Sequence, residues 1–199
     1  METQEPQYWV MSAGEGAKMW DEFHERGIIG IGWDDLGNLK KYKNQQEIRE
    51  ALKKLYKSEQ DPTNDALACF DFEKTIKIGD IVLVKRGIRE LVGYGEVLSD
   101  YIYDESRKEY RHTREVRWIK KGSRRIPKEV VHPPVKTLTN VTKYGDGKYP
   151  QELLNILNKS KNIERAEGLL ASKKQIILYG PPGTGKTYIT KKIAIAIIN

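Results

Sequence analysis

The most specific chemical pattern in this 199-residue sequence is the octapeptide GPPGTGKT at residues 180–187, which satisfies G-x-x-x-x-G-K-[ST] in full. The apolar residues 175–179 before it predict a strand, and the pattern of residues 186–198 after it predicts a helix. Glycines let such a loop turn its backbone N–H groups toward phosphates, and the N-terminus of the helix adds its dipole. The Lys186 ammonium would reach the terminal phosphates, and the Thr187 hydroxyl would ligate Mg²⁺. The residues predicted to bind a nucleotide are Gly180, Gly183, Gly185, Lys186 and Thr187.

This octapeptide resembles the Walker A loop of AAA+ NTPases, and the resemblance covers only the C-terminal segment. It implies GTP or ATP with Mg²⁺ as the cofactor, because the loop contacts phosphates and not the base. Hydrolysis also needs an acidic residue that holds the metal and positions water, and none of that half of the fold follows before Asn199. We therefore expect the intact protein to be a P-loop NTPase, and this chain alone to be inactive.

Upstream of the octapeptide, the order of elements predicts a separate α+β domain built on a small, curved sheet. Strands are expected at residues 7–12, 28–33, 80–86, 91–98, 115–118 and 137–141, and helices at 17–26, 44–57, about 64–75 and 150–158. Glycines within residues 91–98 indicate a bulge or a close approach of the backbone to another group. The predicted boundaries are residues 1–158 for this domain and 159–199 for a linker and the start of the P-loop domain.

The charge of the chain favours an anionic partner, since the formal net charge is +7 and the pI is about 9.3. A merely soluble basic protein would have the same balance, so charge alone leaves both interpretations open. Residues 120–125, which include four cations, are typical of a hairpin tip. The side chains predicted to contact a nucleic-acid backbone are Lys85, Arg86, Arg89, Lys120, Lys121, Arg124 and Arg125.

A second candidate site is aromatic. Trp33 follows the apolar strand residues 28–31 and precedes Asp34, which places a large ring at a strand end beside a carboxylate able to accept a hydrogen bond. Tyr101 and Tyr103 are two residues apart and therefore share one face of an extended segment. A methylated base is flat, apolar on its faces and polar at its edge, so it is held by stacking and by a few hydrogen bonds. Trp33 as an ordinary core residue, and the tyrosines as part of a solvated loop, are the alternatives.

Four short segments, residues 8–12, 27–33, 79–84 and 93–95, resemble the EVE domain of the PUA-like superfamily, which also contains the YTH readers of methylated adenine in RNA. The resemblance covers most of residues 7–145 and implies a PUA-like sheet or pseudo-barrel with flanking helices. Combined with the Walker A loop, it resembles the McrB-type NTPases of modification-dependent restriction systems. That resemblance implies a specificity domain that flips a modified base, methylated adenine being favoured, from duplex DNA. It also implies an McrC-like nuclease partner and a homo-oligomeric AAA+ ring.

The resemblance also implies the residues of the base pocket. Gly32-Trp33 matches the aromatic position of the YTH readers after the first helix, and Ser12 matches the polar end of their first strand. Tyr101 or Tyr103 would supply the second aromatic wall, where the readers have tryptophan. The predicted pocket residues are Ser12, Trp33, Asp34, Tyr101 and Tyr103.

Several functions are not indicated by the sequence. The single cysteine, Cys69, precludes an internal disulfide and is expected in the core, and no triad spacing or cofactor motif is present before residue 150. The sequence contains neither a signal peptide nor an apolar run long enough to span a membrane, so we expect a cytoplasmic protein without a membrane partner. Two alternatives to DNA reading stay open, an RNA-binding PUA-like domain and a protein adaptor for an AAA+ remodeller.

Overall fold

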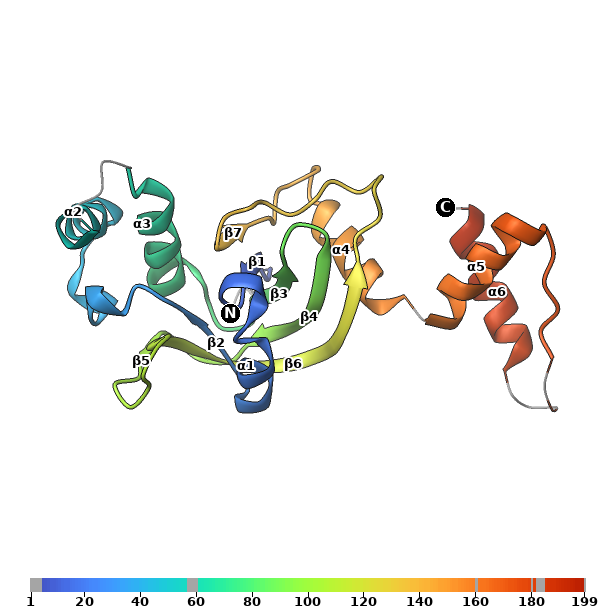
Figure 1. Ribbon diagram of the computed structural model, residues 1–199, viewed down its shortest axis with the longest axis horizontal. Helices are drawn as coiled ribbons and strands as arrows, with labels where there is room; N and C mark the ends of the chain where they lie inside the picture. The colour runs from blue at the N-terminus through green and yellow to red at the C-terminus, as the bar shows by residue number, and fades with distance from the viewer. Residues whose placement is uncertain (1–4, 57–60, 160, 180, 182–184, 199) are drawn as a thin grey trace. The chain divides into compact units, whose positions relative to one another are not determined.

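A mixed, strongly curved β-sheet organises the N-terminal part of the computed structural model (Figure 1). The structure describes residues 5–56, 61–159, 161–179, 181 and 185–198. Within them, the sheet has seven strands: six follow the order β2-β6-β4-β3-β1-β7, and the seventh, β5, pairs with β6. β1 and β3 are parallel, and the other pairs are antiparallel. The strands are β1 (Tyr8–Ser12), β2 (Ile28–Ile31), β3 (Ile81–Arg86), β4 (Glu90–Val97), β5 (Ile102–Tyr103), β6 (His112–Arg125) and β7 (Leu138–Asn140).

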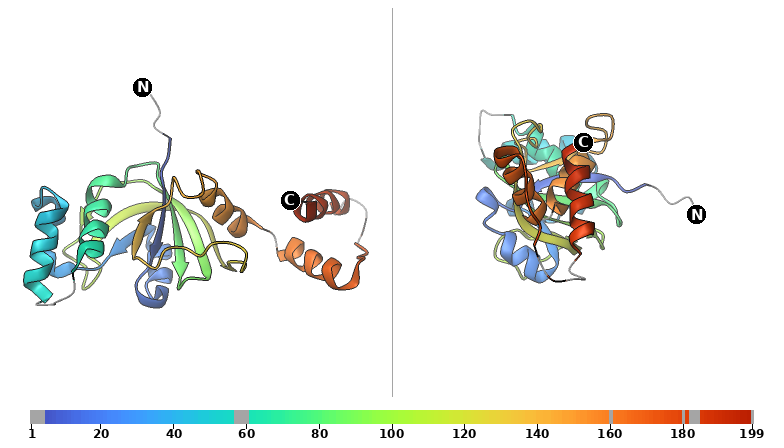
Figure 2. Two further views of the ribbon diagram at one scale, coloured as in Figure 1. Left: turned by 90° about the horizontal axis from the view of Figure 1, so that it is seen from above. Right: turned by 90° about the vertical axis from the view of Figure 1, so that its right-hand side faces the viewer.

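Helices and short helical turns connect and flank these strands (Figure 2). They are the 3-10 turns Glu15–Ala17, Asp34–Leu36 and Leu39–Lys41, the helices α1 (Trp20–Arg26), α2 (Gln45–Tyr56) and α3 (Thr63–Phe70), the π-helical turn Asp71–Thr75, and α4 (Tyr149–Asn158). α2 and α3 contact each other along their lengths. The expected α+β class is confirmed, and most of the expected strands and helices form within a few residues of their predicted bounds.

Both faces of the central strands are buried, which explains the continuous apolar runs in β1 and β3. Trp9 and Met11 belong to one hydrophobic core, and Val10 between them belongs to the other, as the two-residue period of a strand requires. α1, α2 and α3 contribute to the first core, where Cys69 is buried as expected, and α4 contributes to the second. The indole N–H of Trp9 donates to the buried carboxylate of Asp80 (2.8 Å).

The pairing of β4 with β6 confirms one expectation and overturns another. The register shifts next to Gly93 and again next to Gly95, and a Cβ on Gly93 would lie 2.6 Å from the ring of Trp20, so the predicted bulge and close approach are both present. The basic residues 120–125, in contrast, are not a hairpin tip. They continue β6 opposite residues 90–94, because the backbone of this basic segment pairs with β4.

The chain divides into two compact units, Met1–Leu157 and Asn158–Asn199. In the second unit α5 (Lys161–Lys173) and α6 (Lys186–Ile198) contact each other, and the helix predicted after the octapeptide is confirmed. The strand predicted at residues 175–179 is absent, and Ile177 and Tyr179 are 92% and 100% exposed. A strand requires a neighbour for its backbone groups, and none of the described strands pairs with this segment. In the described part of the chain, no helix is long and apolar enough to cross a membrane.

Candidate functional site

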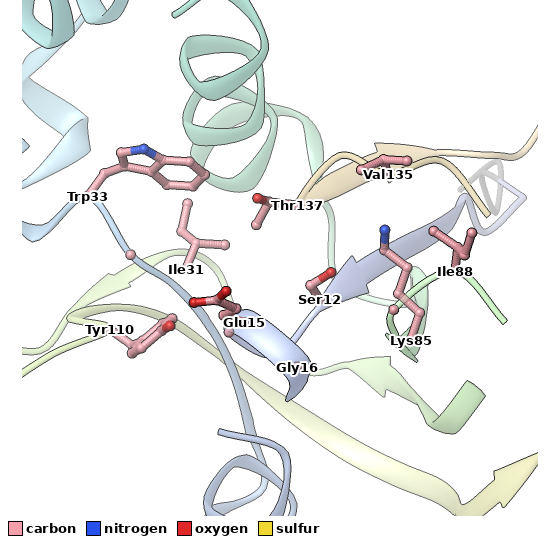
Figure 3. Close-up of a pocket in the computed structure, with 13 residues that line it drawn as sticks. Ser12, Glu15, Gly16, Ile31, Trp33, Lys85, Ile88, Tyr110, Val135 and Thr137 are labelled. Atoms are coloured by element: carbon pink, nitrogen blue, oxygen red, sulfur yellow. The ribbon is translucent and has the colours of Figure 1, made fainter. Parts of the chain in front are cut away.

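A cavity of about 370 Å³ lies where the C-terminal ends of β1, β2 and β3 meet (Figure 3). β1 and β3 are parallel and pair Ser12 with Lys85, so both strands deliver their last residues to the same edge of the sheet. The cavity is lined by Ser12, Gly14, Glu15, Gly16, Ile31, Gly32, Trp33, Lys85, Gly87, Ile88, Tyr110, Val135 and Thr137. Three residues predicted from the sequence, Ser12, Trp33 and Lys85, are therefore brought together.

Trp33 supplies the largest aromatic surface of the cavity, and its backbone is strained. Its φ of 65° and ψ of 36° lie in the left-handed region, which a bulky side chain adopts at a cost of about 1–3 kcal/mol. The indole is hydrogen-bonded to the carboxylate of Asp65 on α3, and the carbonyl oxygen of Trp33 lies 3.2 Å from Nε2 of His112. These contacts hold the half-buried ring at the wall of the cavity.

Asp34 holds the opposite wall, and this corrects its expected role as a hydrogen-bond acceptor for a base. Its Oδ2 accepts from the backbone N–H of Tyr110 (2.9 Å), and its Oδ1 accepts from that of Arg111 (2.7 Å). Asp34 does not line the cavity. The carboxylate instead connects the turn that carries Trp33 to the turn that carries Tyr110.

Tyr110 is the aromatic residue that the sequence did not identify as a pocket wall. Its φ is 55°, its carbonyl oxygen accepts from Nε of Arg107 (2.9 Å), and its ring packs edge-on against Phe23 with centroids 5.8 Å apart. Gly14 is required beside it, because a Cβ there would lie 2.7 Å from the Tyr110 hydroxyl oxygen. Burial raises the pKa of Tyr110 above its ordinary value.

The two tyrosines predicted as cage walls lie elsewhere. Tyr101 is only 3% exposed, and its hydroxyl group is 2.7 Å from Nδ1 of His112 and accepts from the N–H of Leu39 (3.1 Å). Tyr103 also packs against the His112 ring, with centroids 5.3 Å apart. Neither side chain lines the cavity, because the short β5 pairs with β6 and directs both toward the interior.

His112 links Tyr101 to the pocket. The Trp33 carbonyl oxygen can only accept, so the ring proton lies on Nε2 and is donated to it, and Nδ1 of the neutral ring accepts from the Tyr101 hydroxyl. Burial lowers the pKa of His112, while the hydrogen bond to Trp33 and the charge of Asp34 raise it. The ring is neutral in this arrangement and positions the backbone of Trp33.

The opposite end of the cavity carries a buried cation. Lys85 is 2% exposed, burial lowers its pKa to about 8, and its Nζ donates to the carbonyl oxygen of Pro134. Among the described residues no carboxylate forms an ion pair with it. A desolvated ammonium group without an anionic neighbour is costly, so this end of the cavity favours an anionic or strongly hydrogen-bond-accepting ligand.

The other predicted backbone contacts do not line the cavity. Arg86 is exposed and lies 3.5 Å from Glu90, whereas Arg89 donates to the carbonyl oxygens of Pro127 (3.2 Å) and Val130 (3.1 Å) and so holds a loop. Lys121 pairs with an aspartate of α1 (3.0 Å). The rest of the basic run, Lys120, Arg124 and Arg125, lies along β6.

The octapeptide is described only in part. Gly180 and Gly183 lie outside the described residues. Gly185 has a φ of +73°, Lys186 begins α6 and donates to the carbonyl oxygen of Pro181 (2.6 Å), and Thr187 is exposed. A left-handed glycine directly before a helix N-terminus fits a phosphate-binding loop, in which Lys186 would contact phosphate and Thr187 would ligate Mg²⁺. In the described part of the chain, no group of His, Cys, Asp and Glu side chains could hold a metal ion by itself.

The family of the chain follows from comparison with known proteins. The chain is similar to the YTH domain-containing protein mmi1 in a complex with RNA (12% identity, 86% of this chain and 88% of that chain covered, TM-score 0.42). It is also similar to the YTH domain of the Zygosaccharomyces rouxii MRB1 protein in complex with N6-methyladenosine RNA (13% identity, 79% and 90% covered, TM-score 0.42). No curated protein matches its sequence. The model of the family described as a domain of unknown function, DUF8426, matches residues 9–144, and the chain belongs to this family.

Proposed function

We propose that the cavity binds a single modified base extruded from a nucleic acid, and that duplex DNA carrying methylated adenine is its ligand. The observation that supports this most directly is Trp33, which has a strained left-handed backbone, an indole hydrogen-bonded to Asp65 and a carbonyl oxygen that accepts from His112. Strain of this kind persists where the surrounding structure enforces it, and it is common at ligand-binding positions.

The chemistry of the walls suits a base. The Trp33 ring offers apolar surface for a flat ring and its methyl group, and the side chains of Ser12, Glu15 and Thr137 face the space beside it (Figure 3). A methylated exocyclic amine keeps one N–H, which the exposed Glu15 carboxylate could accept, and the hydroxyl groups could satisfy ring nitrogens. A desolvated aromatic wall favours the methyl-bearing form.

The buried cation supports a nucleic acid over a neutral small molecule. Lys85 has no carboxylate partner among the described residues, and the whole chain carries a net charge of +7. A phosphate next to the extruded base would supply the missing negative charge. Extrusion from a duplex costs a few kcal/mol, and contacts between phosphates and basic side chains would offset that cost.

The octapeptide supports a wider role, in which base reading directs an NTPase. We propose that the intact protein is an McrB-like AAA+ motor, that it binds GTP or ATP with Mg²⁺ through the loop before α6, and that it acts with an McrC-like nuclease from a homo-oligomeric ring. The motif and the helix that begins at Lys186 support this proposal.

The test is direct binding of the 199-residue chain to one fluorescent oligonucleotide sequence in several forms. These are duplex DNA that is unmodified, methylated on adenine or methylated on cytosine, and single-stranded RNA with and without methylated adenine, each at two salt concentrations. We expect preference for the methyl-adenine duplex that survives the higher salt, since discrimination by stacking is not screened. Preference for methylated RNA would reassign the domain to RNA. Binding that is equal for all forms and collapses with salt would contradict base reading and favour the adaptor alternative.

A further inference from the structure

Two exposed apolar side chains stand on the rim of the cavity. Ile88 is 43% exposed at the turn between β3 and β4, and Val135 is 76% exposed in the loop before β7. Both line the cavity, next to Lys85 (Figure 3). Scattered exposed apolar residues are ordinary, but these two both lie on the lining of one cavity and so add apolar surface at its rim.

The rim is preorganised by hydrogen bonds between the two segments that carry these side chains. Lys85 donates to Pro134, the residue before Val135, and Arg89, the residue after Ile88, donates to the carbonyl oxygens of Pro127 and Val130. The N–H of residue 126 also donates to the carbonyl oxygen of Arg89 (2.8 Å). The turn and the loop therefore present Ile88 and Val135 together, with little conformational entropy left to lose on binding.

Cations flank both apolar tips. Arg86 lies before the tip of the turn and Lys136 directly follows Val135, and both are exposed. An apolar tip between cations fits poorly against an apolar protein surface, because the charges would have to be desolvated. It fits a duplex, where phosphates border the space between adjacent base pairs.

Accordingly, we propose that Ile88 and Val135 form a wedge that enters the duplex and fills the gap left by the base that the cavity holds. This inference rests on the proposed function and adds to it the two side chains that fill the space left in the duplex by the extruded base. Extrusion removes the stacking contacts of one base, and apolar side chains inserted between base steps replace part of them. Ile88 and Val135 line the cavity in which the base would be held. The side chains that fill the gap would therefore lie next to the base that has left it.

The experiment compares Ile88→Ala, Val135→Ala and the double variant with the wild-type chain on three DNAs with the same methyl-adenine site. The site is paired in a duplex, unpaired in a bulge, or present in a single strand. The matched control is Ile78→Ala, because Ile78 is 59% exposed and does not line the cavity. Each substituted side chain is exposed, and a thermal melt of every variant checks that folding is retained.

We expect the double variant to bind the paired duplex about tenfold more weakly, which corresponds to about 1.4 kcal/mol. Binding to the bulge and to the single strand should stay within about twofold, since no gap must be filled there. Equal loss on all three DNAs, or no loss on any, would overturn the wedge while leaving base reading intact. Absence of any preference for the methylated base by the wild-type chain would overturn the proposed function itself, and the wedge with it.

Discussion

The two ends of the cavity differ in the residues that form them, although each end has a free-energy cost for the protein without a ligand. At the aromatic end, Trp33 and Tyr110 each have a left-handed backbone, and Asp34 holds both turns in place. At the cationic end, Lys85 is buried without a carboxylate partner among the described residues. The cost at the aromatic end is backbone strain, and the cost at the cationic end is the desolvation of a charge.

This difference indicates what each end can recognise. A strained backbone that is fixed by hydrogen bonds presents a rigid plane, which discriminates by shape and stacking. A buried ammonium group discriminates by charge and is insensitive to the identity of a base. We therefore assign base discrimination to the aromatic end and affinity for an anionic group to the cationic end, and substitutions at the two ends should separate the two properties.

The largest effect is expected for Trp33→Ala. Removal of the ring should abolish preference for the modified base, a loss of about 1–3 kcal/mol or up to about 100-fold, and leave salt-sensitive binding. Trp33→Gly should lose the same preference but be more stable than Trp33→Ala, because glycine adopts a φ of 65° without strain. Fluorescence anisotropy titrations and thermal melts measure the two properties.

Tyr103→Ala is the control for this prediction, because it also removes a half-buried aromatic side chain, but one that does not line the cavity. It should keep the preference for the modified base. Loss of preference in Tyr103→Ala together with retention in Trp33→Ala would reverse the assignment of the aromatic end.

The sequence predicted the aromatic end only in part, for a physical reason. Trp33 was identifiable because it lies at the end of a short apolar strand, which is a local pattern, whereas Ser12 was predicted only from the resemblance to the YTH readers. Tyr110 could not be predicted as a cavity wall, since its position depends on a hydrogen bond to Asp34, which lies 76 residues away. It also depends on a left-handed φ, which the pattern of side chains does not predict. Tyr101 was misplaced because two-residue spacing predicts a shared face and does not say which face is buried.

The same limit applies to the fold. The continuous, mostly apolar runs of β1 and β3 predict those strands, because both of their faces are buried. The basic end of β6 was taken for a turn, since its charged residues hide the strand from a pattern of apolar residues, although its pairing with β4 makes it one. The apolar residues 175–179 predicted a strand that does not form, because a strand depends on a neighbour as well as on its own sequence.

An intermediate effect is expected for Lys85→Met. Affinity for the methylated duplex should fall about tenfold, and the slope of log affinity against log salt should decrease by about one, while preference for the modified base is retained. Thermal stability should rise by an amount of order 1 kcal/mol, because a buried charge is replaced by an apolar side chain of similar length. A variant that loses preference as strongly as affinity would contradict the separation of the two ends.

The pH dependence sharpens this prediction. The pKa of Lys85 in the folded chain, about 8, is below its ordinary value of 10.5. Between about pH 8 and pH 10.5 the unfolded chain therefore binds more protons than the folded chain. The stability of the wild-type chain should rise relative to that of Lys85→Met as the pH increases through this range. Affinity should change in the opposite direction, since the ammonium group is lost above about pH 8. Titrations at pH 7 and pH 9 measure it, and Lys85→Met should show no such change.

The smallest effect is expected at acidic pH and concerns how the aromatic end is held. Burial lowers the pKa of His112 below its ordinary value of 6.5, so the unfolded chain takes up a proton at a higher pH than the folded chain. Stability should therefore fall as pH decreases below 6.5. A proton on Nδ1 removes the acceptor for the Tyr101 hydroxyl. Four groups face the ring: Tyr101, Tyr103, the Trp33 carbonyl and Asp34. Of these, only Asp34 carries a charge that favours the imidazolium ion.

Preference for the modified base should consequently weaken a few-fold between pH 7 and pH 5.5 in the wild-type chain. His112→Gln, which can still donate to the Trp33 carbonyl, should show a flatter profile. His24, whose pKa is also lowered by burial, lies on α1 outside the cavity, and His24→Gln should retain the wild-type profile. If instead His24→Gln flattens the profile and His112→Gln does not, then the acid sensitivity arises at α1, and Trp33 is held by Asp34 and Asp65 without the histidine.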